Sequence, residues 1–484
     1  GIDLSGEGDM VWYRRRDAAE NNSIEDTERG LDNVIYTDST SGAADPGLYG
    51  LQAFNSDGFT AGYDTSGGDY VSWTFRKAPK FFDVVTWSGD QSGPRALSHN
   101  LDNNVGLIIT KSTNQSDNWY CWLKGLNNGY HMLNKTSIAS SYTGLWNNTA
   151  PTTTTFTVDD DLNKTGWDYV AYLFADNNSD GNFGPTGDQD IIKCGNYTGT
   201  GTSGSGENPI NVGFEPQWVF ITSTNEYEGR FIMDNMRGVV FANTDARIEV
   251  NDTAAEASNN AMVEFIADGF CPANTQKTNK SGKNYFYVAI RRGPMAPLQD
   301  PDDAFNVANH VPDAAGRLQS SGFVTDVALT TNPSSSNDNW ISTRLQMGQT
   351  LRTNITNPIV NFPAYLQFDQ QDGIFTDYFW GSTTAPKWWQ FARREGFLDV
   401  AVYHGNGSTT WRNHNLGVVP EMMWIKAQNA SEDWVVYHKD RTSASKVLHL
   451  NTNQNEQTVL SPYDIPSTPT STQFRVGTNS RVNG

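Results

Sequence analysis

Short sequence strings recur along the chain about once every hundred residues. The clearest copy runs from Phe397 to Lys439. It contains three segments rich in valine and aromatic residues, separated by Gly, Asn and Ser, a pattern typical of short strands and tight turns. Within it, residues 417–425 read Gly-Val-Val-Pro-Glu-Met-Met-Trp-Ile, and residues 213–221 repeat this as Gly-Phe-Glu-Pro-Gln-Trp-Val-Phe-Ile. A period of this length is too long for a solenoid coil or a propeller blade, and it suits a β-sandwich of about seven strands.

The repeats predict an all-β protein, a tandem array of about five antiparallel β-sandwich units of roughly 100 residues each. The expected units are 1–77, 81–175, 189–291, 302–393 (the most divergent) and 397–484, with joints near 78–80, 176–189, 292–302 and 394–397. The first unit lacks the opening hairpin of the others, and the last lacks a closing strand. We therefore expect a segment of a longer array. The alternative is that a neighbouring chain donates the missing strand.

The composition favours strands and excludes two classes of partner. Only 18% of the 484 residues are charged, 12% are aromatic and 43 are Gly, so the best helical candidate is one segment, Asp252 to Ala267. A net charge of −20 repels phosphate backbones, and no apolar run reaches the length of about 18 residues that spans a bilayer, so we expect no nucleic-acid partner and no membrane insertion. Because Cys121, Cys194 and Cys271 are few, odd in number and far apart, we expect buried thiols rather than disulfides or a structural zinc site.

Four strings carry a resemblance to a known family: Phe-Phe-Asp-Val-Val at 81–85, Tyr-Val-Ala-Tyr-Leu-Phe-Ala at 169–175, His-Asn-Leu-Gly-Val-Val-Pro-Glu-Met-Met-Trp-Ile-Lys at 414–426 and Asp-Trp-Val-Val-Tyr-His at 433–438. In this order they resemble a repeated domain of structural proteins from marine bacteriophages such as cyanophages. The resemblance covers nearly the whole chain, least well from 296 to 392. It implies a virion component, a tail fibre or another appendage, and it supplies no catalytic residues.

One motif has the spacing of a calcium loop. Residues 176–181 read Asp-Asn-Asn-Ser-Asp-Gly, so Asp176, Asn178 and Asp180 could aim oxygens at one Ca²⁺ ion. Gly187 stands where a bidentate Glu is expected, and Asp188 or Asp190 would have to replace it. The other interpretation is an Asn/Asp-rich turn between units that binds no metal. Ca²⁺ is the one cofactor the sequence suggests, and none is required.

Four aromatic residues are candidates for glycan contacts. Trp87, Tyr197 and Tyr403 occupy equivalent positions before Gly-rich hairpins, and their rings could stack on sugars, although burial in the sandwich core is the favoured interpretation. Trp411, inside a loop of the last unit, is the better candidate for an exposed platform.

The remaining motifs favour structural roles. His99 and His414 stand at equivalent repeat positions, which indicates side chains bonded at a turn rather than catalysis. The run Arg14-Arg15-Arg16 is expected to be a solvated strand edge, because alternate strand residues face opposite ways. The sequence has no nucleophile elbow on a strand–helix turn, and it leaves open a carboxylate pair of the glycosidase type.

We therefore expect a non-enzymatic phage appendage protein, located in the virion. Its expected partners are further copies of itself, other virion proteins and a host-surface glycan or protein. The alternative is a secreted or surface glycan-binding or glycan-degrading repeat protein. The two differ in their aromatic residues: a lectin should expose the same cluster in several units, whereas a structural array should bury its equivalent aromatic residues.

Overall fold

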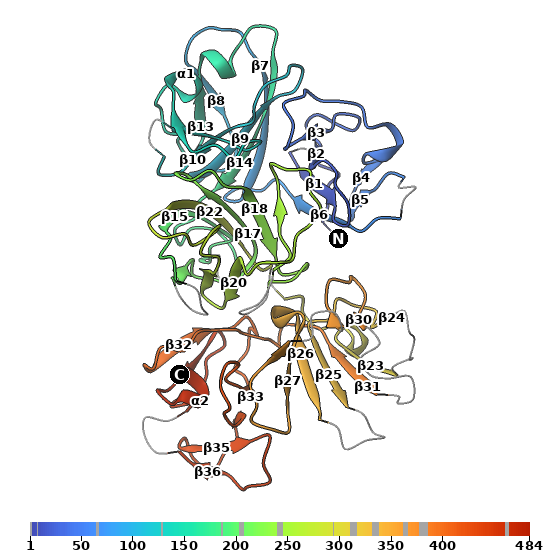
Figure 1. The fold of residues 1–484 in the computed structure, drawn as a ribbon, viewed down its shortest axis with the longest axis vertical. Coiled ribbons are helices and arrows are strands. Elements are labelled where there is room, and N and C mark those ends of the chain that lie inside the picture. The colour runs from blue at the N-terminus through green and yellow to red at the C-terminus, as the bar shows by residue number, and fades with distance from the viewer. Residues whose placement is uncertain are drawn as a thin grey trace.

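The computed structural model describes residues 2–6, 8–63, 67–126, 129–184, 187–202, 208–239, 245–293, 295–309, 317–331, 338–361, 366–376, 386–459 and 464–484. Nearly all of the regular structure is β, and the strands pair antiparallel, which confirms the all-β fold class. Units 1 to 5 below denote residues 1–77, 81–175, 189–291, 302–393 and 397–484. Units 1 to 3 gather in one half of the molecule and units 4 and 5 in the other (Figure 1). No helix in the described ranges is long and apolar enough to cross a membrane.

Each unit combines a larger sheet with a smaller one or a hairpin. Unit 1 has the sheet β3-β2-β1-β6 and the hairpin β4-β5, from β1 (Met10–Arg15), β2 (Ser23–Asp26), β3 (Ile35–Tyr36), β4 (Ala53–Asn55), β5 (Gly58–Thr60) and β6 (Tyr70–Phe75), with η1 (Gly47–Tyr49). Unit 2 has β12-β11-β10-β9-β14-β7 and β13-β8, from β7 (Phe82–Ser88), β8 (Arg95–Ser98), β9 (Val105–Ser112), β10 (Tyr120–Leu123), β11 (Gly129–Met132), β12 (Ser140–Ser141), β13 (Thr155–Val158) and β14 (Asp168–Ala175), with α1 (Thr143–Trp146) and η2 (Asp160–Leu162).

Unit 3 has β15-β22-β17-β18-β19 and β16-β21-β20, from β15 (Ile192–Thr198), β16 (Ile210–Asn211), β17 (Pro216–Ser223), β18 (Arg230–Asp234), β19 (Ile248–Glu249), β20 (Val263–Ile266), β21 (Gly269–Pro272) and β22 (Asn284–Arg291). Unit 4 has β23-β31-β25-β26-β27-β28 and β24-β30-β29, from β23 (Phe305–Asn309), β24 (Arg317–Gln319), β25 (Val327–Thr331), β26 (Trp340–Thr343), β27 (Gln349–Arg352), β28 (Val360–Asn361), β29 (Leu366–Gln367), β30 (Ile374–Thr376) and β31 (Lys387–Phe391), with η3 (Pro301–Asp303) and η4 (Arg344–Gln346). Unit 5 has β33-β34-β35-β36 and β32-β37, from β32 (Thr410–Asn413), β33 (Met422–Ile425), β34 (Val435–His438), β35 (Lys446–His449), β36 (Gln457–Thr458) and β37 (Gln473–Val476), with α2 (Ser480–Asn483).

The larger sheets of units 1 to 4 share one plan. A central strand (β1, β9, β17, β25) pairs on one side with the strand that follows it and on the other side with the closing strand (β6, β14, β22, β31). In units 2 to 4 an opening strand (β7, β15, β23) then pairs with the far edge of the closing strand. The register fixes equivalent residues: Met10 pairs with Phe75, Leu107 with Phe174, Trp218 with Ile290 and Val327 with Phe391. The sequence match with residues 213–221 places Met422 at the Trp218 position.

One backbone hydrogen bond recurs between successive units. The donor N–H belongs to the residue that lies seven positions after the last residue of the unit's third strand (β3, β11, β19 or β27). The acceptor carbonyl lies just after the central strand of the next unit in the series. The bonds run from Ala43 N–H to Thr113 O (2.5 Å), Ala139 N–H to Thr224 O (2.8 Å), Glu256 N–H to Arg16 O (2.8 Å) and Ile359 N–H to Gln428 O (2.8 Å). The third bond returns from unit 3 to unit 1, so units 1, 2 and 3 form a closed ring. The fourth joins unit 4 to unit 5 in the same way as unit 1 is joined to unit 2.

A side-chain contact repeats the same geometry. In each case a side chain at one repeat position donates to the third-strand carbonyl of the preceding unit in the series. These contacts are Trp119 Nε1 to Tyr36 O (2.9 Å), Arg230 Nε to Met132 O (3.3 Å), Asn22 Nδ2 to Glu249 O (3.4 Å) and Trp434 Nε1 to Arg352 O (2.8 Å). The first three again close the ring, and the fourth joins unit 4 to unit 5. Trp, Arg and Asn therefore serve one geometric purpose at one position.

The centre of the ring is an apolar core shared by three sheets. Phe75 of unit 1 has ring centroids within 5.5 Å of Phe82 and Phe174 of unit 2, and within 5.7 Å of Trp218 of unit 3. The same cluster of buried residues continues through all three units. Because alternate residues of a strand face opposite ways, each sheet has one face in its own sandwich and the other in this common core.

Three expectations from the sequence are wrong. Residues 397–404 form no strand, because no closing strand lies beside them in the described residues, although β33 and β34 occur as expected. The segment 252–267 contains strand β20 and no helix. The run of arginines is no solvated edge: Arg14 is buried and donates to Asp252 O, Thr253 O and Ala254 O, and Arg16 pairs with Glu256 and Asp369 at 2.8 and 3.1 Å. Unit 3 covers this edge, so the arginines bind carbonyls and carboxylates instead of water.

Candidate functional site

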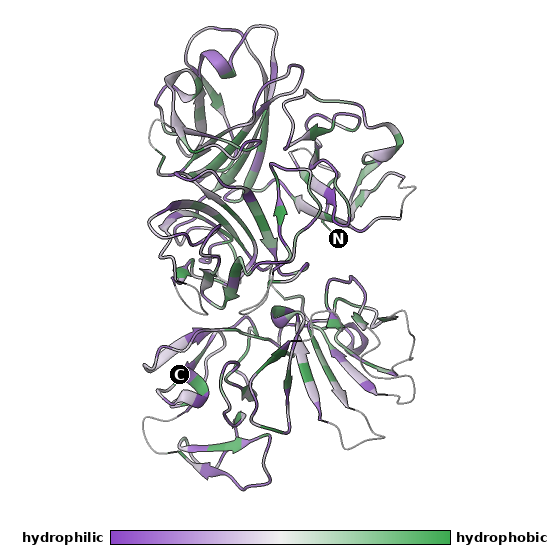
Figure 2. Cartoon of the chain, viewed as in Figure 1, coloured by the Kyte–Doolittle hydropathy of each residue, from purple (hydrophilic) through white to green (hydrophobic). Residues whose placement is uncertain are grey.

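Units 4 and 5 expose part of the sheet face that units 1 to 3 bury in the ring. Met422 and Trp424 of β33 are 52% and 41% exposed, whereas their counterparts Trp218 and Phe220 in β17 are 5% and 3% exposed. Apolar residues follow the strands in both halves of the molecule (Figure 2). A sheet with two apolar faces is buried on both sides in a stable protein, so the exposed face of units 4 and 5 is suited to covering by another sheet.

The opening strand of unit 4 repeats this difference. Phe305 and Val307 of β23 are 37% and 48% exposed, whereas the residues at their register positions in β7, Phe82 and Val84, are buried. We call the surface formed by Phe305, Val307, Met422 and Trp424 the open face.

Unit 5 also has an unpaired strand edge. In the described residues β33 pairs with β34 alone, whereas β9 and β17 each pair with a closing strand as well. Around this edge, Val418, Val419 and Phe397 are exposed. An unpaired edge flanked by apolar side chains is a template for an added strand.

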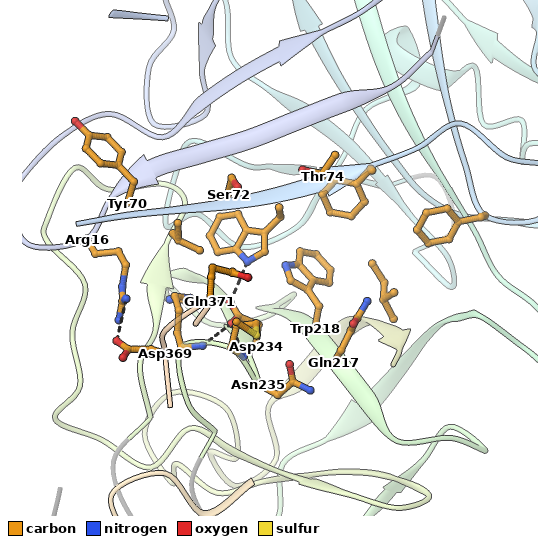
Figure 3. A pocket seen from close by; sticks show the side chains of 17 residues that line it. Arg16, Tyr70, Ser72, Thr74, Gln217, Trp218, Asp234, Asn235, Asp369 and Gln371 are labelled. Carbon is orange, nitrogen blue, oxygen red and sulfur yellow. Dashed lines mark hydrogen bonds and ion pairs between the residues drawn. The ribbon is translucent and has the colours of Figure 1, made fainter. Parts of the chain in front are cut away.

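A second unpaired strand edge, that of β6, lies in the ring. β6 pairs with β1 and, in the described residues, with no opening strand. A cavity of about 310 Å³ lies at its far edge, lined by β6 and, across from it, Gln217, Trp218 and Ile290 of unit 3 (Figure 3). In the next interface round the ring, the opening strand β15 lies in the equivalent place, where the Cys194 side chain approaches Gly106 of unit 2. The cavity therefore lies where an opening strand would pair with β6.

Charged groups form one wall of this cavity. Trp73 Nε1 donates to Asp234 Oδ2 (2.9 Å), and the Arg237 guanidinium lies 5.2 Å from the Trp73 ring and 2.6 Å from the same carboxylate. Burial raises the pKa of Asp234, but the Arg237 charge and hydrogen bonds outweigh burial and hold the pKa below its usual value. Arg16 and Asp369 form an ion pair at the cavity mouth (Figure 3). An entering strand therefore meets a fixed, fully paired polar wall.

The residues of the predicted calcium loop are engaged within the protein. Asp176 is buried; its Oδ1 accepts from the Cys194 N–H (2.9 Å) and its Oδ2 pairs with Lys124. Asp180 Oδ1 accepts from the Asn178 N–H at 2.7 Å, and Asp188 is exposed. In the parts of the chain that the structure describes, no three carboxylates of this loop converge as metal ligands would. The calcium site stays a prediction, and a Ca²⁺ titration without binding below millimolar concentration would remove it.

Three of the four predicted glycan-contacting aromatic residues lie in cores. Trp87 stacks on Tyr169 (5.1 Å between ring centroids) and donates to Leu162 O, and Tyr197 stacks on Tyr285 (4.9 Å) and donates to Thr278 O. Tyr403 donates to Val482 O at 2.7 Å and is partly buried against Phe474. These equivalent rings present no open platform. Trp411 of β32 is exposed, with the Arg475 guanidinium 5.9 Å from its ring.

The two repeat-equivalent histidines serve as turn braces. His99 Nε2 lies 3.3 Å from Thr152 O and its Nδ1 accepts from the Leu101 N–H. His414 makes the same two contacts, with Thr470 O and the Leu416 N–H. Burial lowers the pKa of both side chains, which favours the neutral form that these contacts use.

One constellation was missed by the sequence reasoning. Glu264 and Cys271 of unit 3 and His404 of unit 5 bring their ligand atoms within 4.8 Å of one another. The turn signal Asp268-Gly269 between β20 and β21 could have predicted that Glu264 faces Cys271, but nothing local places His404 beside them.

Comparison with known proteins identifies a family without a described role. Searches of curated proteins and of solved structures gave no match. A family model described as a domain of unknown function, DUF7483, matches residues 2–294 and 391–484. The first range coincides with the closed ring and the second with unit 5 and the strand end before it. Since these ranges cover more than half of the chain, the protein belongs to the DUF7483 family.

Proposed function

We propose that the protein is a non-enzymatic structural component of an extracellular particle, an appendage such as a tail fibre of a bacteriophage, that assembles through the open face. One observation carries the proposal: the positions of Phe82 and Val84 and of Trp218 and Phe220, buried in units 2 and 3, are exposed as Phe305 and Val307 in unit 4 and as Met422 and Trp424 in unit 5. Exposed apolar patches of this kind mark association surfaces.

A second copy of the chain is the proposed occupant of the open face. In the ring, the corresponding sheet face of each unit is covered by the sheet faces of the other two units. The open face of another molecule would therefore be a matching partner. A second copy carries one, and a two-fold arrangement would cover both copies at once. In a virion, other structural proteins and a host-surface glycan or protein would complete its contacts.

The aromatic residues favour this function over a lectin. The positions Trp87, Tyr197 and Tyr403 repeat between units, and all three rings pack against neighbouring core residues. Repeated glycan sites would expose them. Glycan binding stays the alternative at a single place, the exposed Trp411. It would be supported by glycan-array signals that Trp411→Ala removes, and excluded by arrays without signal.

Sedimentation of the full chain over a wide concentration range tests the assembly. We expect reversible association, and we expect the double variant Met422→Lys, Trp424→Lys to remain monomeric, because two charges would be buried in the interface. Tyr227→Lys, a change at an exposed aromatic residue outside the open face, is the matched control and should associate normally.

Two results would contradict the proposal. One is a full chain that stays monomeric at every concentration, and the other is a double variant that associates like the wild type. Electron microscopy of native particles with the chain located in the density tests the virion assignment separately; a chain found only free or on cell surfaces would refute that assignment alone.

A further inference from the structure

Three metal-ligand side chains converge where unit 5 meets unit 3. Glu264 on β20 and Cys271 on β21 are a directly opposed cross-strand pair, so their side chains share one face of the hairpin. His404, from the segment before β32, approaches from unit 5, with its Nε2 3.0 Å from Glu264 Oε2. The three ligand atoms lie within 4.8 Å of one another, and no other such group occurs among the residues that the structure describes.

The site is buried and held from both sides. Cys271 and Glu264 are buried, and His404 is partly so. Beside them, the Ala267 N–H donates to Val402 O (2.8 Å) and Asn413 Nδ2 donates to Asp268 Oδ1 (2.6 Å). These two bonds fix the histidine segment against the hairpin, so the trio is positioned by backbone and side-chain contacts that involve none of its three members.

The ligand pair occurs only in the hairpin that meets another unit's histidine. The corresponding hairpin of unit 1 has Ala53 opposite Thr60, and that of unit 4 has Gln367 opposite Phe375. Only in unit 3 does the pair become Glu and Cys. In unit 3 a carboxylate and a thiol stand at this pair of positions, where the imidazole of His404 arrives from unit 5.

The Cys271 thiol is unusual for an ordinary buried cysteine. It is in no disulfide, and it makes no hydrogen bond with any residue in the described ranges, whereas the buried Cys194 thiol donates to Ala175 O. A metal ion deprotonates the thiol that it coordinates, so a thiol beside an imidazole and a carboxylate, without a hydrogen-bond partner in the described ranges, is chemically suited to bind a cation.

We propose that Glu264, Cys271 and His404 bind one Zn²⁺ ion and thereby fasten unit 5 to unit 3. Thiolate sulfur, imidazole nitrogen and carboxylate oxygen are the donors that zinc takes in proteins, and donors of a tetrahedral site lie about 3.5 Å apart, within reach of the spacing here. Three protein ligands leave the fourth position to water. Binding forms a Zn–S bond and releases the thiol proton to solvent, with no change of oxidation state.

A zinc ion bound by Glu264, Cys271 and His404 would differ from the expectation, based on cysteine number alone, that the chain has no structural zinc site. Cysteine counting detects sites built from several cysteines. A site with one cysteine, one histidine and one glutamate from distant segments has no such signature.

The test uses the full chain without a polyhistidine tag, freed of metal by a chelator that is then removed. Isothermal titration with Zn²⁺ should give one site per chain, and Co²⁺ should give a thiolate-to-cobalt charge-transfer band. Cys271→Ser and His404→Gln should each weaken Zn²⁺ binding by more than about tenfold and remove or alter the cobalt spectrum. Because zinc binds the thiolate and the neutral imidazole, affinity should fall as the pH is lowered.

Cys194→Ser is the matched control, because it changes another buried cysteine that lies outside the trio. It should leave Zn²⁺ affinity and the cobalt band unchanged. His404→Gln lies at a less buried position, so it remains informative if Cys271→Ser fails to fold. Absence of Zn²⁺ binding, or equal affinity in the wild type and both ligand variants, would overturn the proposal.

Discussion

The two halves of the molecule contain the same interface between units, which closes into a ring in one half and occurs once in the other. Units 1, 2 and 3 repeat a backbone bond three times and return to their starting point, whereas units 4 and 5 make the same bond once, from Ile359 to Gln428. The sheet faces that meet inside the ring are therefore buried, and those of the pair are open. One set of contacts can thus give either a finished body or a surface for assembly.

The difference also shows what the interface requires of the sequence. Its donors at one side-chain position are Trp119, Arg230, Asn22 and Trp434, which share only the ability to reach a carbonyl of the preceding unit. The apolar core of the ring accepts Met, Leu and Trp at the register position of Met10. Geometry of the backbone, rather than identity of the side chains, is what the units have in common.

The largest expected effect is a difference in stability between variants at two joints, the one between units 4 and 5 and the one between units 1 and 2. Arg393 is buried between Glu215 of unit 3 (2.7 Å) and Asp399 of unit 5 (2.7 Å), and Lys77 is the equivalent residue, half-open, beside Asp83. Arg393→Ala should cost about 3–5 kcal/mol, because two carboxylates stay buried without their cation. Lys77→Ala should cost about 1 kcal/mol or less, because Lys77 is partly exposed and Asp83 keeps its hydrogen bonds from the Val84 and Asn100 N–H groups.

Urea unfolding of the two variants, followed by tryptophan fluorescence, measures this contrast. Equal losses in the two variants would show that the joints do not differ as described.

Truncating the apolar residue at the Trp218 position should destabilise the ring far more than the pair of units 4 and 5, a difference nearly as large as the one above. Trp218→Ala removes a buried ring that packs on Phe75, and we expect a loss of about 3–5 kcal/mol. Met422→Ala, at the equivalent exposed position, should change the stability of the dilute monomer by less than about 0.5 kcal/mol. Thermal unfolding checks both. A large loss for Met422→Ala at low concentration would mean that the open face is covered within one chain.

A smaller effect should be the same in both halves. Trp119→Phe and Trp434→Phe each remove an indole N–H that donates to a carbonyl of the preceding unit, and each should cost about 1 kcal/mol. Hydrogen exchange at the neighbouring third strands, β3 and β27, reports the loosening locally. A loss in only one of the two would show that the contacts are not equivalent.

The smallest effect concerns alkaline pH. Lys111 and Lys426 are equivalent lysines, each bonded to nearby carbonyls. Lys111 is buried and Lys426 is half-buried, and burial lowers the pKa of each to about 8. Between this value and the ordinary pKa of about 10.4, the unfolded chain binds more protons, so these groups make stability rise with pH in this window. Lys111→Met and Lys426→Met should each flatten the curve of unfolding free energy against pH. Unchanged slopes in both variants would contradict the burial of the charge.

The sequence was a good guide to what is local. Alternation of Val and aromatic residues predicted the strands β33 and β34, because period-two patterns follow directly from strand geometry. The repeat positions of His99 and His414 indicated turn braces, and those of Trp87 and Tyr197 favoured the core.

The contacts between units could not be predicted from the sequence, because they depend on backbone atoms and on residues far apart in the chain. The recurring bond from Ala43 to Thr113 uses backbone atoms only, so it leaves no residue pattern. Arg14 looked like a solvated residue because its partners are carbonyls in unit 3, far away in sequence. Residues 397–404 have the composition of a strand, but a strand exists only where a neighbour pairs with it.

Cryo-electron microscopy of the full chain, prepared at a concentration where sedimentation detects association, tests the central claim most directly. We expect an intact ring of units 1 to 3, with Met422 and Trp424 buried against units 4 and 5 of a second copy. Copies that associate through other surfaces, or single copies that leave Met422 and Trp424 in solvent at every concentration, would contradict it.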